Sequence, residues 1–378
     1  MNVAEGFALT TWADGTDDNR FRVNSPDAAT GPFKHIKESQ ADGIMRIALP
    51  IDPREATAAG LYLELWGGHP GVRNKRVTVN GGPTIDLPEV GAAEGHCTYS
   101  YPTIPLPIEH LRPGENAFAF TCDGGDTFWG HYLISGAAVV LSLPDNHARL
   151  AAHASARACR VGAEVAGEVV HPQLDGLGDL RPERVDFAGH YDGFDDDGDL
   201  LTVGWHGYTK NGAPVGTLGE GFDAAMLPTP RNFKLRATAH LGDGLSFTTP
   251  AVAVDVPSPR RVLRVGPDGG PRSVWSRENV VRPLDLTLDV DPAEVERAQL
   301  HVKIWDGGRG DAEHPVRLNG HPLPVAGEGW HDVIYRVLEI EPGLLRRGAN
   351  RFEVQADTVH HGIEVLRPGP TLFLRLRS

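Results

Sequence analysis

Residues Ile51 to Pro83 read IDPREATAAGLYLELWGGHPGVRNKRVTVNGGP. The pattern returns without a gap from Val290 to Pro322 as VDPAEVERAQLHVKIWDGGRGDAEHPVRLNGHP. Both stretches begin with an apolar residue and Asp-Pro, carry a tryptophan after alternating apolar residues, continue into a glycine-rich loop and end beside an Asn-Gly pair. Similarity kept in one register over this length indicates an internal repeat.

Two further matches extend the repeat toward the C-terminal side of each unit. LRPGENAFAF (Leu111 to Phe120) matches LRRGANRFEV (Leu345 to Val354), and ISGAAVVLSL (Ile134 to Leu143) matches RPGPTLFLRL (Arg367 to Leu376). Loop deletions account for the small shifts in spacing between these matches. We therefore predict three units: a first copy, residues 1–146; a middle segment, residues 147–258; and a second copy, residues 259–378.

The periodicity within each copy is that of β-strands. Leu61, Leu63 and Leu65 alternate with other residues, which places apolar side chains on one face of a sheet. Asn80-Gly81 and Asn319-Gly320 each follow a short apolar alternation, and Asn-Gly accepts the positive φ angles of a tight hairpin turn. Sustained helical patterns are absent. We expect an all-β protein of antiparallel sandwiches.

The Asn-Gly turns and the Leu-x-x-Gly-x-Asn motifs together resemble the galactose-binding-like jelly roll. The residues that carry the resemblance are Val79-Asn80-Gly81 with Leu111 to Asn116, and Leu318-Asn319-Gly320 with Leu345 to Asn350. The resemblance covers most of each copy and implies two β-jelly-roll domains. Domains of this type occur as carbohydrate-binding modules and as non-catalytic sugar-binding domains beside glycosidase barrels.

The middle segment has a different pattern of short alternating runs, such as Phe233 to Ala239. This pattern predicts an Ig-like β-sandwich, of immunoglobulin or fibronectin type. The stretch from Arg149 to Arg160 is compatible with one or two helical turns. Pro257-Ser258-Pro259 is a stiff linker signal that closes the segment.

Composition narrows the range of partners. The 378 residues carry a net charge of −14, which disfavours nucleic acid and anionic membrane surfaces because both are held by clustered cations. No apolar stretch is long enough for a membrane span, and the start lacks the features of a signal peptide, so we expect a cytoplasmic protein as written, or an extracellular one if the sequence is trimmed. We expect the three cysteines to be buried small apolar residues, although Cys97 and Cys122 are a possible disulfide pair.

The best candidates for ligand binding are aromatic and polar residues near the glycine-rich loops. Sugars are held by stacking on an aromatic ring while polar side chains bind the hydroxyls. Because Trp66 and Trp305 occupy the same place in both copies, we favour a core role for these two and a binding role for the residues after them. The candidates are Trp66, His69, Arg73, Asn74, Trp129 and His131 in the first copy, and Trp305, Asp306 and Arg309 in the second.

An enzymatic alternative uses carboxylates of the second copy. Glycoside hydrolysis needs two carboxyl groups about 5 to 10 Å apart. The candidates, which His314, His331 and Trp330 would accompany in a cleft, are Asp306, Asp311, Glu313, Glu328 and Asp332. Signature motifs of common enzyme classes are missing.

The middle segment also holds an acidic run, Tyr191 to Asp199, whose oxygen ligands suit Ca²⁺ although the spacing does not match an EF-hand. The candidate calcium ligands are Asp192, Asp195, Asp197 and Asp199. The alternative is a solvated acidic turn with local hydrogen bonds.

Together these features lead us to expect non-catalytic carbohydrate recognition, with an oligosaccharide or polysaccharide as partner. The alternative functions are those of a glycoside hydrolase or polysaccharide lyase, and of a structural protein that buries its tryptophan loops in an assembly.

Overall fold

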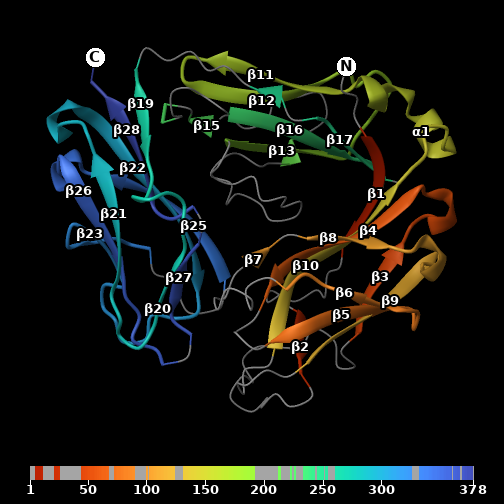
Figure 1. The fold of residues 1–378 in the computed structure, drawn as a ribbon. Coiled ribbons are helices and arrows are strands. Elements are labelled where there is room, and N and C mark those ends of the chain that lie inside the picture. The colour runs from red at the N-terminus through yellow and green to blue at the C-terminus, as the bar shows by residue number, and fades with distance from the viewer. Residues whose placement is uncertain are drawn as a thin grey trace.

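In the computed structural model the chain is an all-β protein of antiparallel sheets, as the periodicity predicts (Figure 1). No helix within the described part of the chain is long and apolar enough to cross a membrane. The structure describes residues 5–11, 21–25, 44–67, 72–89, 99–100, 102–123, 131–191, 212–213, 222–223, 225–226, 233–242, 245–250, 252–253, 260–325, 332–359, 361–366 and 368–377.

The second copy contains two sheets with an apolar core between them. Its strands are β19 (Val262–Val265), β20 (Val274–Ser276), β21 (Arg282–Leu288), β22 (Val295–Asp306), β23 (Val316–Leu318), β24 (His321–Pro322), β25 (Asp332–Ile340), β26 (Gly348–Val354), β27 (Ile363–Val365) and β28 (Thr371–Leu376). One sheet has the order β19-β28-β22-β27-β20, with β25 paired to β22, and the other has the order β21-β26-β23-β24. Alternate apolar residues of β21 and β22 point into the core, which explains their period of two.

The first copy has a four-stranded sheet of the same order. Its strands are β1 (Glu5–Thr11), β2 (Phe21–Asn24), β3 (Ile44–Leu49), β4 (Ala58–Trp66), β5 (Arg73–Val79), β6 (Thr84–Asp86), β7 (Tyr99–Ser100), β8 (Thr103–Leu106), β9 (Gly114–Asp123) and β10 (His131–Ser142). The order β3-β9-β5-β6 corresponds strand for strand to β21-β26-β23-β24. The other strands of this copy belong to a sheet built around the β10–β4 pair.

That second sheet continues into the middle segment. The strands there are β11 (Arg160–Ala166), β12 (Val169–Asp175), β13 (Arg184–Tyr191), β14 (Gly212–Ala213), β15 (Phe222–Asp223), β16 (Phe233–His240), β17 (Leu245–Thr248) and β18 (Val252–Ala253). Strand β1 pairs with β10 on one side and with β17 on the other, so an 11-stranded sheet crosses the boundary predicted at residue 146 (Figure 1). A separate sheet has the order β11-β12-β15.

Helical structure is limited to short turns. The stretch predicted to form one or two helical turns contains α1 (Ala148–Ala152) and a 3₁₀ turn. The 3₁₀ turns among the described residues are Pro53–Glu55, Ile108–His110, Ala154–Ala158, Pro292–Glu294 and Pro342–Leu344.

Both Asn-Gly turns have the predicted backbone. Asn80 and Gly81 have φ angles of 49° and 72°, and Asn319 and Gly320 have φ angles of 52° and 84°. Positive φ at both central residues is the geometry of a type I′ hairpin. Each turn brings a strand of the four-stranded sheet back beside its neighbour.

A buried asparagine anchors each Asn-Gly turn. The Asn350 side chain accepts hydrogen bonds from Arg346 N and Asn319 Nδ2, both at 2.8 Å, and donates to Arg346 O and Gly348 O. Asn116 makes the same four kinds of contact in the first copy. An asparagine amide has two donor hydrogens and two acceptor lone pairs, so both side chains are fully satisfied without water.

The apolar core is divided. One cluster joins the first copy to the middle segment and includes Phe373 of the second copy, and another fills the second copy alone. Cys122 and Cys159 are buried free thiols, in keeping with the predicted apolar role, while Cys97 lies outside the described residues.

Candidate functional site

The two tryptophans of the repeat lie against each other. The rings of Trp66 and Trp305 are stacked, with centroids 5.4 Å apart and planes 14° apart, and both side chains are 0% exposed. Leu133 and Leu366, which also occupy matching positions in the two copies, complete this small cluster. We call these four residues the seam. Since neither ring face is open, Trp66 and Trp305 do not serve as sugar platforms here, and the core role favoured from their shared position fits the structure.

Two further predicted contact residues are buried close to the seam. His131 is 1% exposed, and its ring centroid lies 5.5 Å from that of Trp66. Asp306 is also 1% exposed, and its Oδ1 accepts a hydrogen bond from Gly308 N at 3.1 Å. The prediction that these side chains meet a ligand at the surface is therefore not supported, because both are buried.

Arg73 and Asn74 lie on the exposed start of β5. Asn74 has a φ of 53° at an irregularity in the β5–β9 pairing, and its side chain donates a hydrogen bond to Asp123 Oδ2 at 2.5 Å. The Arg76 guanidinium binds the other oxygen of the same carboxylate. Asn74 therefore anchors the chain at this irregularity, whereas Arg73 remains an exposed candidate.

Several predicted residues lie outside the described part of the chain. Of Asp332 only the backbone is described, and it pairs with Asp306 at the ends of β25 and β22. No group of three or more potential metal ligands occurs among the residues that the structure describes. The candidates outside the described residues are His69, Trp129, Glu328, Asp192, Asp195, Asp197 and Asp199.

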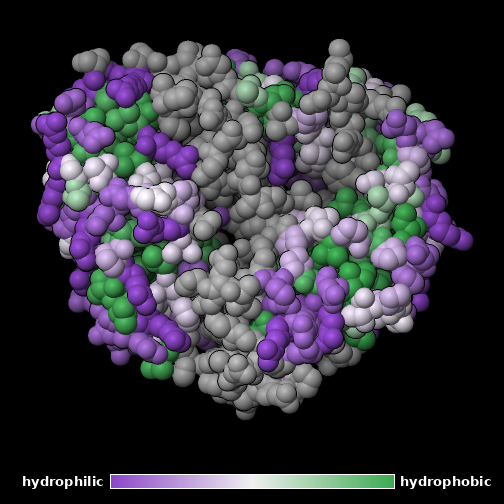
Figure 2. Space-filling model, viewed as in Figure 1, coloured by the Kyte–Doolittle hydropathy of each residue, from purple (hydrophilic) through white to green (hydrophobic). Residues whose placement is uncertain are grey.

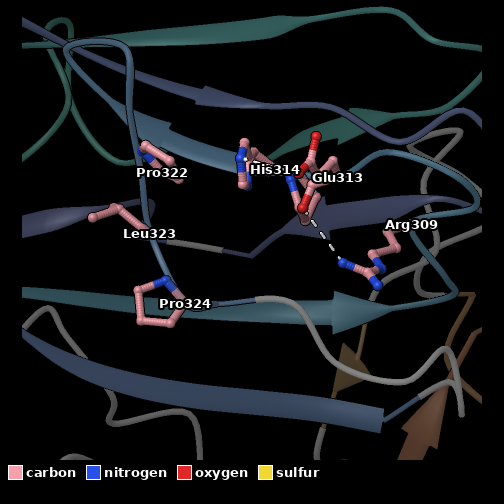
Figure 3. A pocket seen from close by; sticks show the side chains of 7 residues that line it. Arg309, Glu313, His314, Pro322, Leu323 and Pro324 are labelled. Carbon is pink, nitrogen blue, oxygen red and sulfur yellow. Dashed lines mark hydrogen bonds and ion pairs between the residues drawn. The ribbon is translucent and has the colours of Figure 1, made fainter.

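The second copy carries a pocket of about 380 Å³ (Figure 3). It contains residues that were predicted to bind a ligand and residues that were predicted to take part in catalysis. Arg309 was predicted to bind a ligand, Glu313 to act as a catalytic carboxylate, and His314 to accompany it. The β22–β23 loop supplies one wall and the segment after the Asn319-Gly320 turn supplies the other. The lining residues are Arg309, Glu313, His314, Pro315, Pro322, Leu323 and Pro324.

Backbone hydrogen bonds and one glycine hold the β22–β23 loop in place. Asp357 N donates to Arg309 O at 3.2 Å, and Asp311 N donates to the Asp357 carboxylate at 2.8 Å. Gly310 has a φ of 63°, and a Cβ at this position would overlap the same carboxylate. A side chain at position 310 is therefore excluded both by the backbone angle and by the lack of space.

The hairpin at Asn319-Gly320 positions the opposite wall of the pocket. The tight turn reverses the chain so that Pro322 pairs with Arg317, and Leu323 N donates to Val316 O at 2.9 Å. This places Pro322, Leu323 and Pro324 across from His314 (Figure 3). The position of the prolines directly after an Asn-Gly turn was the signal in the sequence that could have identified them.

The polar groups of the pocket form a short chain. Arg309 donates from a guanidinium nitrogen to the Glu313 carbonyl oxygen at 3.5 Å, and His314 Nε2 lies 3.8 Å from Glu313 Oε1. The side chains of His314 and Glu313 are 44% and 87% exposed, so both can reach a ligand. Glu313 is the one carboxylate among the described lining residues. The arrangement can donate and accept hydrogen bonds beside the exposed prolines Pro322 and Pro324.

Comparison with known proteins finds no matching family model and no matching curated protein. Among solved structures, the chain is similar at 14% identity to a β-porphyranase of glycoside hydrolase family 86 from Bacteroides plebeius, over 58% of this chain and 37% of that one, with a TM-score of 0.25. An exo-β-1,3-galactanase from Phanerochaete chrysosporium is 8% identical, over 73% of this chain and 62% of that one, with a TM-score of 0.17. The ANX1 ectodomain from Arabidopsis thaliana is 10% identical, over 88% and 81%, with a TM-score of 0.18. The chain spans little more than a third of the porphyranase. TM-scores this low do not show a shared fold.

Proposed function

We propose that the protein binds an oligosaccharide or polysaccharide without chemistry of its own, through the pocket of the second copy. The scaffold would be two galactose-binding-like jelly rolls on either side of an Ig-like sandwich. The observation that carries the proposal is the meeting of an apolar wall, Pro322 to Pro324, with the exposed polar groups of Arg309, Glu313 and His314.

This combination matches the chemistry of a sugar. A pyranose presents C–H groups on its faces and hydroxyl groups around its edge, so it binds where an apolar surface adjoins hydrogen-bonding side chains. The exposed rings of Pro322 and Pro324 offer most of the apolar surface, since Pro315 and Leu323 are buried. The Arg309 guanidinium donates hydrogen bonds, the Glu313 carboxylate accepts them, and the His314 ring has one nitrogen for each role when neutral.

The positions of the described carboxylates in the second copy fit glycan binding better than glycan hydrolysis. A glycosidase places two carboxyl groups on either side of the bond that is cleaved. Among the described residues, Glu313 lines the pocket, whereas Asp306 is buried and Asp311 is not part of the lining. We therefore assign Glu313 the role of a hydrogen-bond acceptor for sugar hydroxyls.

A glycan-array screen of the full chain, with and without Ca²⁺, tests the proposal, followed by product analysis of each ligand found. Binding without release of reducing sugar is the expected result. Turnover with a bell-shaped pH profile would instead support the enzymatic alternative. Dependence on Ca²⁺ would implicate the predicted ligands from Asp192 to Asp199. Failure to bind any glycan would overturn the proposal.

The location of the site is tested by Arg309→Ala. We expect the affinity for the glycan found in the screen to fall about tenfold or more, because hydrogen bonds to a charged group contribute about 1.5 to 3 kcal/mol. The matched control is Arg347→Ala, which removes an exposed arginine just before β26, at the end of this strand away from the pocket. Equal affinities of the two variants would place the site elsewhere.

A further inference from the structure

Each Asn-Gly turn combines a chemically labile residue with open surroundings. Asparagine is among the least durable side chains, and it loses its amide fastest before a glycine, which has no side chain to shield its backbone nitrogen. Gly81 and Gly320 are exposed, and no atom beyond the adjacent residues lies within 4 Å of the place that a Cβ would take. Figure 2 shows mainly hydrophilic residues at the left edge of the view, where β23 and β26 lie in Figure 1. Water, which the reaction consumes, therefore reaches both turns.

Loss of the amide is a cyclisation followed by a hydrolysis. Gly320 N gives up its proton and forms a bond to Asn319 Cγ, the Cγ–Nδ2 bond breaks, and ammonia leaves with a proton from the solvent. Water then opens the five-membered succinimide at either of its two carbonyl carbons, which yields aspartate or isoaspartate. Because Cγ is tetrahedral in the transition state of the first step, the planar side-chain amide of the starting state is lost there.

The protein holds the Asn319 amide in its planar starting state. Asn319 Nδ2 donates to Leu344 O and to Asn350 Oδ1, both at 2.8 Å, so both hydrogens of the leaving nitrogen are bound. Asn319 Oδ1 accepts a hydrogen bond from Arg351 N at 2.9 Å. Interactions that are stronger in the starting state than in the transition state slow a reaction. The three hydrogen bonds therefore oppose the loss of the amide.

The first copy holds Asn80 in the same way. Asn80 Nδ2 donates to His110 O and to Asn116 Oδ1, both at 2.8 Å, and Asn80 Oδ1 accepts from Ala117 N at 2.9 Å. Asn116 and its counterpart Asn350 are both 0% exposed, so each holds its turn from inside the copy. The other partners are backbone groups, so the buried asparagine is the partner that a substitution can remove.

We infer that Asn80 and Asn319 are self-modification sites, which deamidate to aspartate and isoaspartate unless the buried asparagine of the same copy holds the side-chain amide. The product cannot restore the network, because a carboxylate has no hydrogen to donate and isoaspartate adds a methylene group to the backbone of the turn. At Asn319 the change falls on the hairpin that positions Pro322 and Pro324, so it alters a wall of the pocket. Asn350 thus protects the shape of the pocket.

Peptide mapping by mass spectrometry tests the inference on the full chain. The wild type is kept at mildly alkaline pH, either folded or unfolded in urea, and the fraction of aspartate and isoaspartate at each turn is followed over time. We expect both turns to react about tenfold or more slowly in the folded chain, as the loss of two hydrogen bonds in the transition state predicts. Equal rates in the folded and unfolded chains would overturn the inference.

Two variants provide reciprocal controls. Asn350→Ala should raise the rate at Asn319 about fivefold or more, as the loss of one hydrogen bond predicts, and leave the rate at Asn80 in the same sample unchanged. Asn116→Ala should do the reverse. Unchanged protection of Asn319 in Asn350→Ala would overturn the inference. Reaction at both turns would show that the variant unfolds as a whole, and the wild-type rates, which need no variant, then decide.

Discussion

His301 shows how burial dominates the protonation of a side chain. It is 3% exposed, its ring packs edge-on against Phe373 at 4.4 Å between centroids, and its Nε2 lies 3.3 Å from Gln299 Oε1. Burial lowers the pKa of His301 from 6.5 to about 3, with Arg264 adding to the shift and Glu339 opposing it. The imidazole is therefore neutral in the folded protein at any pH near neutrality.

This pKa predicts a dependence of stability on pH. Below pH 6.5 the unfolded chain takes up a proton at His301, but the folded chain does not until the pH nears 3. The contribution is thus fully present above pH 6.5 and is lost as the pH falls toward 3, by about 1 kcal/mol per pH unit. Urea unfolding of the wild type and of His301→Leu across this range measures it. Parallel stability curves for the two proteins would contradict the expected role.

The buried amide of Asn350 anchors the Asn319-Gly320 turn. Asn350→Ala leaves buried donor and acceptor groups of Asn319 and Arg346 without their partner, so we expect a loss of about 2 to 4 kcal/mol in the free energy of unfolding. Arg346→Ala is the control, because the network uses only the backbone of this exposed residue. A loss no larger than that of the control would show that the network contributes little.

Strand β1 connects the first copy to the middle segment. Its seven residues pair with β10 of the first copy and with β17 of the middle segment. The backbone N–H groups of a central strand point alternately to its two neighbours, so β1 completes the ladder on one edge of β10 and on one edge of β17, whose other edges pair with β4 and β16. The first copy and the middle segment should therefore unfold together.

Ala8→Pro tests this dependence. Ala8 pairs with Leu141 and with Leu245, so a proline there removes a ladder donor on one side of β1. We expect amide hydrogen exchange to speed up in both β10 and β17, since loss of β1 exposes both edges. Ala8→Ser, which keeps the N–H, is the control. Faster exchange confined to one of the two strands would contradict a shared unit.

The seam joins the copies through residues in matching positions. Trp66 meets Trp305, and Leu133 joins the same cluster as Leu366. Two residues before each tryptophan, and so on the same face of the strand, the copies differ in charge: Glu64 and Lys303 are both buried.

A double-mutant cycle measures the contribution of the seam. Trp66→Ala and Trp305→Ala should each lower the free energy of unfolding by about 3 to 5 kcal/mol. The double variant should lose less than the sum by about 1 kcal/mol, because the second substitution removes a contact that is already broken. Trp66→Ala combined with Leu284→Ala, in the separate core of the second copy, should be additive. Additivity in the tryptophan pair would contradict direct coupling across the seam.

An ion pair joins the middle segment to the second copy. Arg375 of β28 pairs with Glu168, beside the β11–β12 turn, at 2.7 Å, and the two side chains are 15% and 27% exposed. The three units are thus connected by a shared sheet, by stacked tryptophans and by an ion pair.

Local patterns predicted the all-β class and the backbone of the Asn-Gly turns, because strand alternation and a positive φ angle depend on residues close together in the chain. They also placed Arg309, Glu313 and His314 in one loop. The prolines of the opposite wall were missed, because only the reversed chain after the turn brings them across from that loop.

The amino-acid sequence determines where strands and tight turns form, because these structures depend on interactions between residues that are close in the chain. Which tryptophans, histidines and carboxylates reach water is settled by tertiary packing. Trp66 and Trp305 were candidates for sugar stacking, although their shared position favoured a core role, and in the structure the two rings stack on each other and are buried. Burial depends on residues far apart in the chain, and alternation along a single strand does not show which part of its outer face meets another sheet.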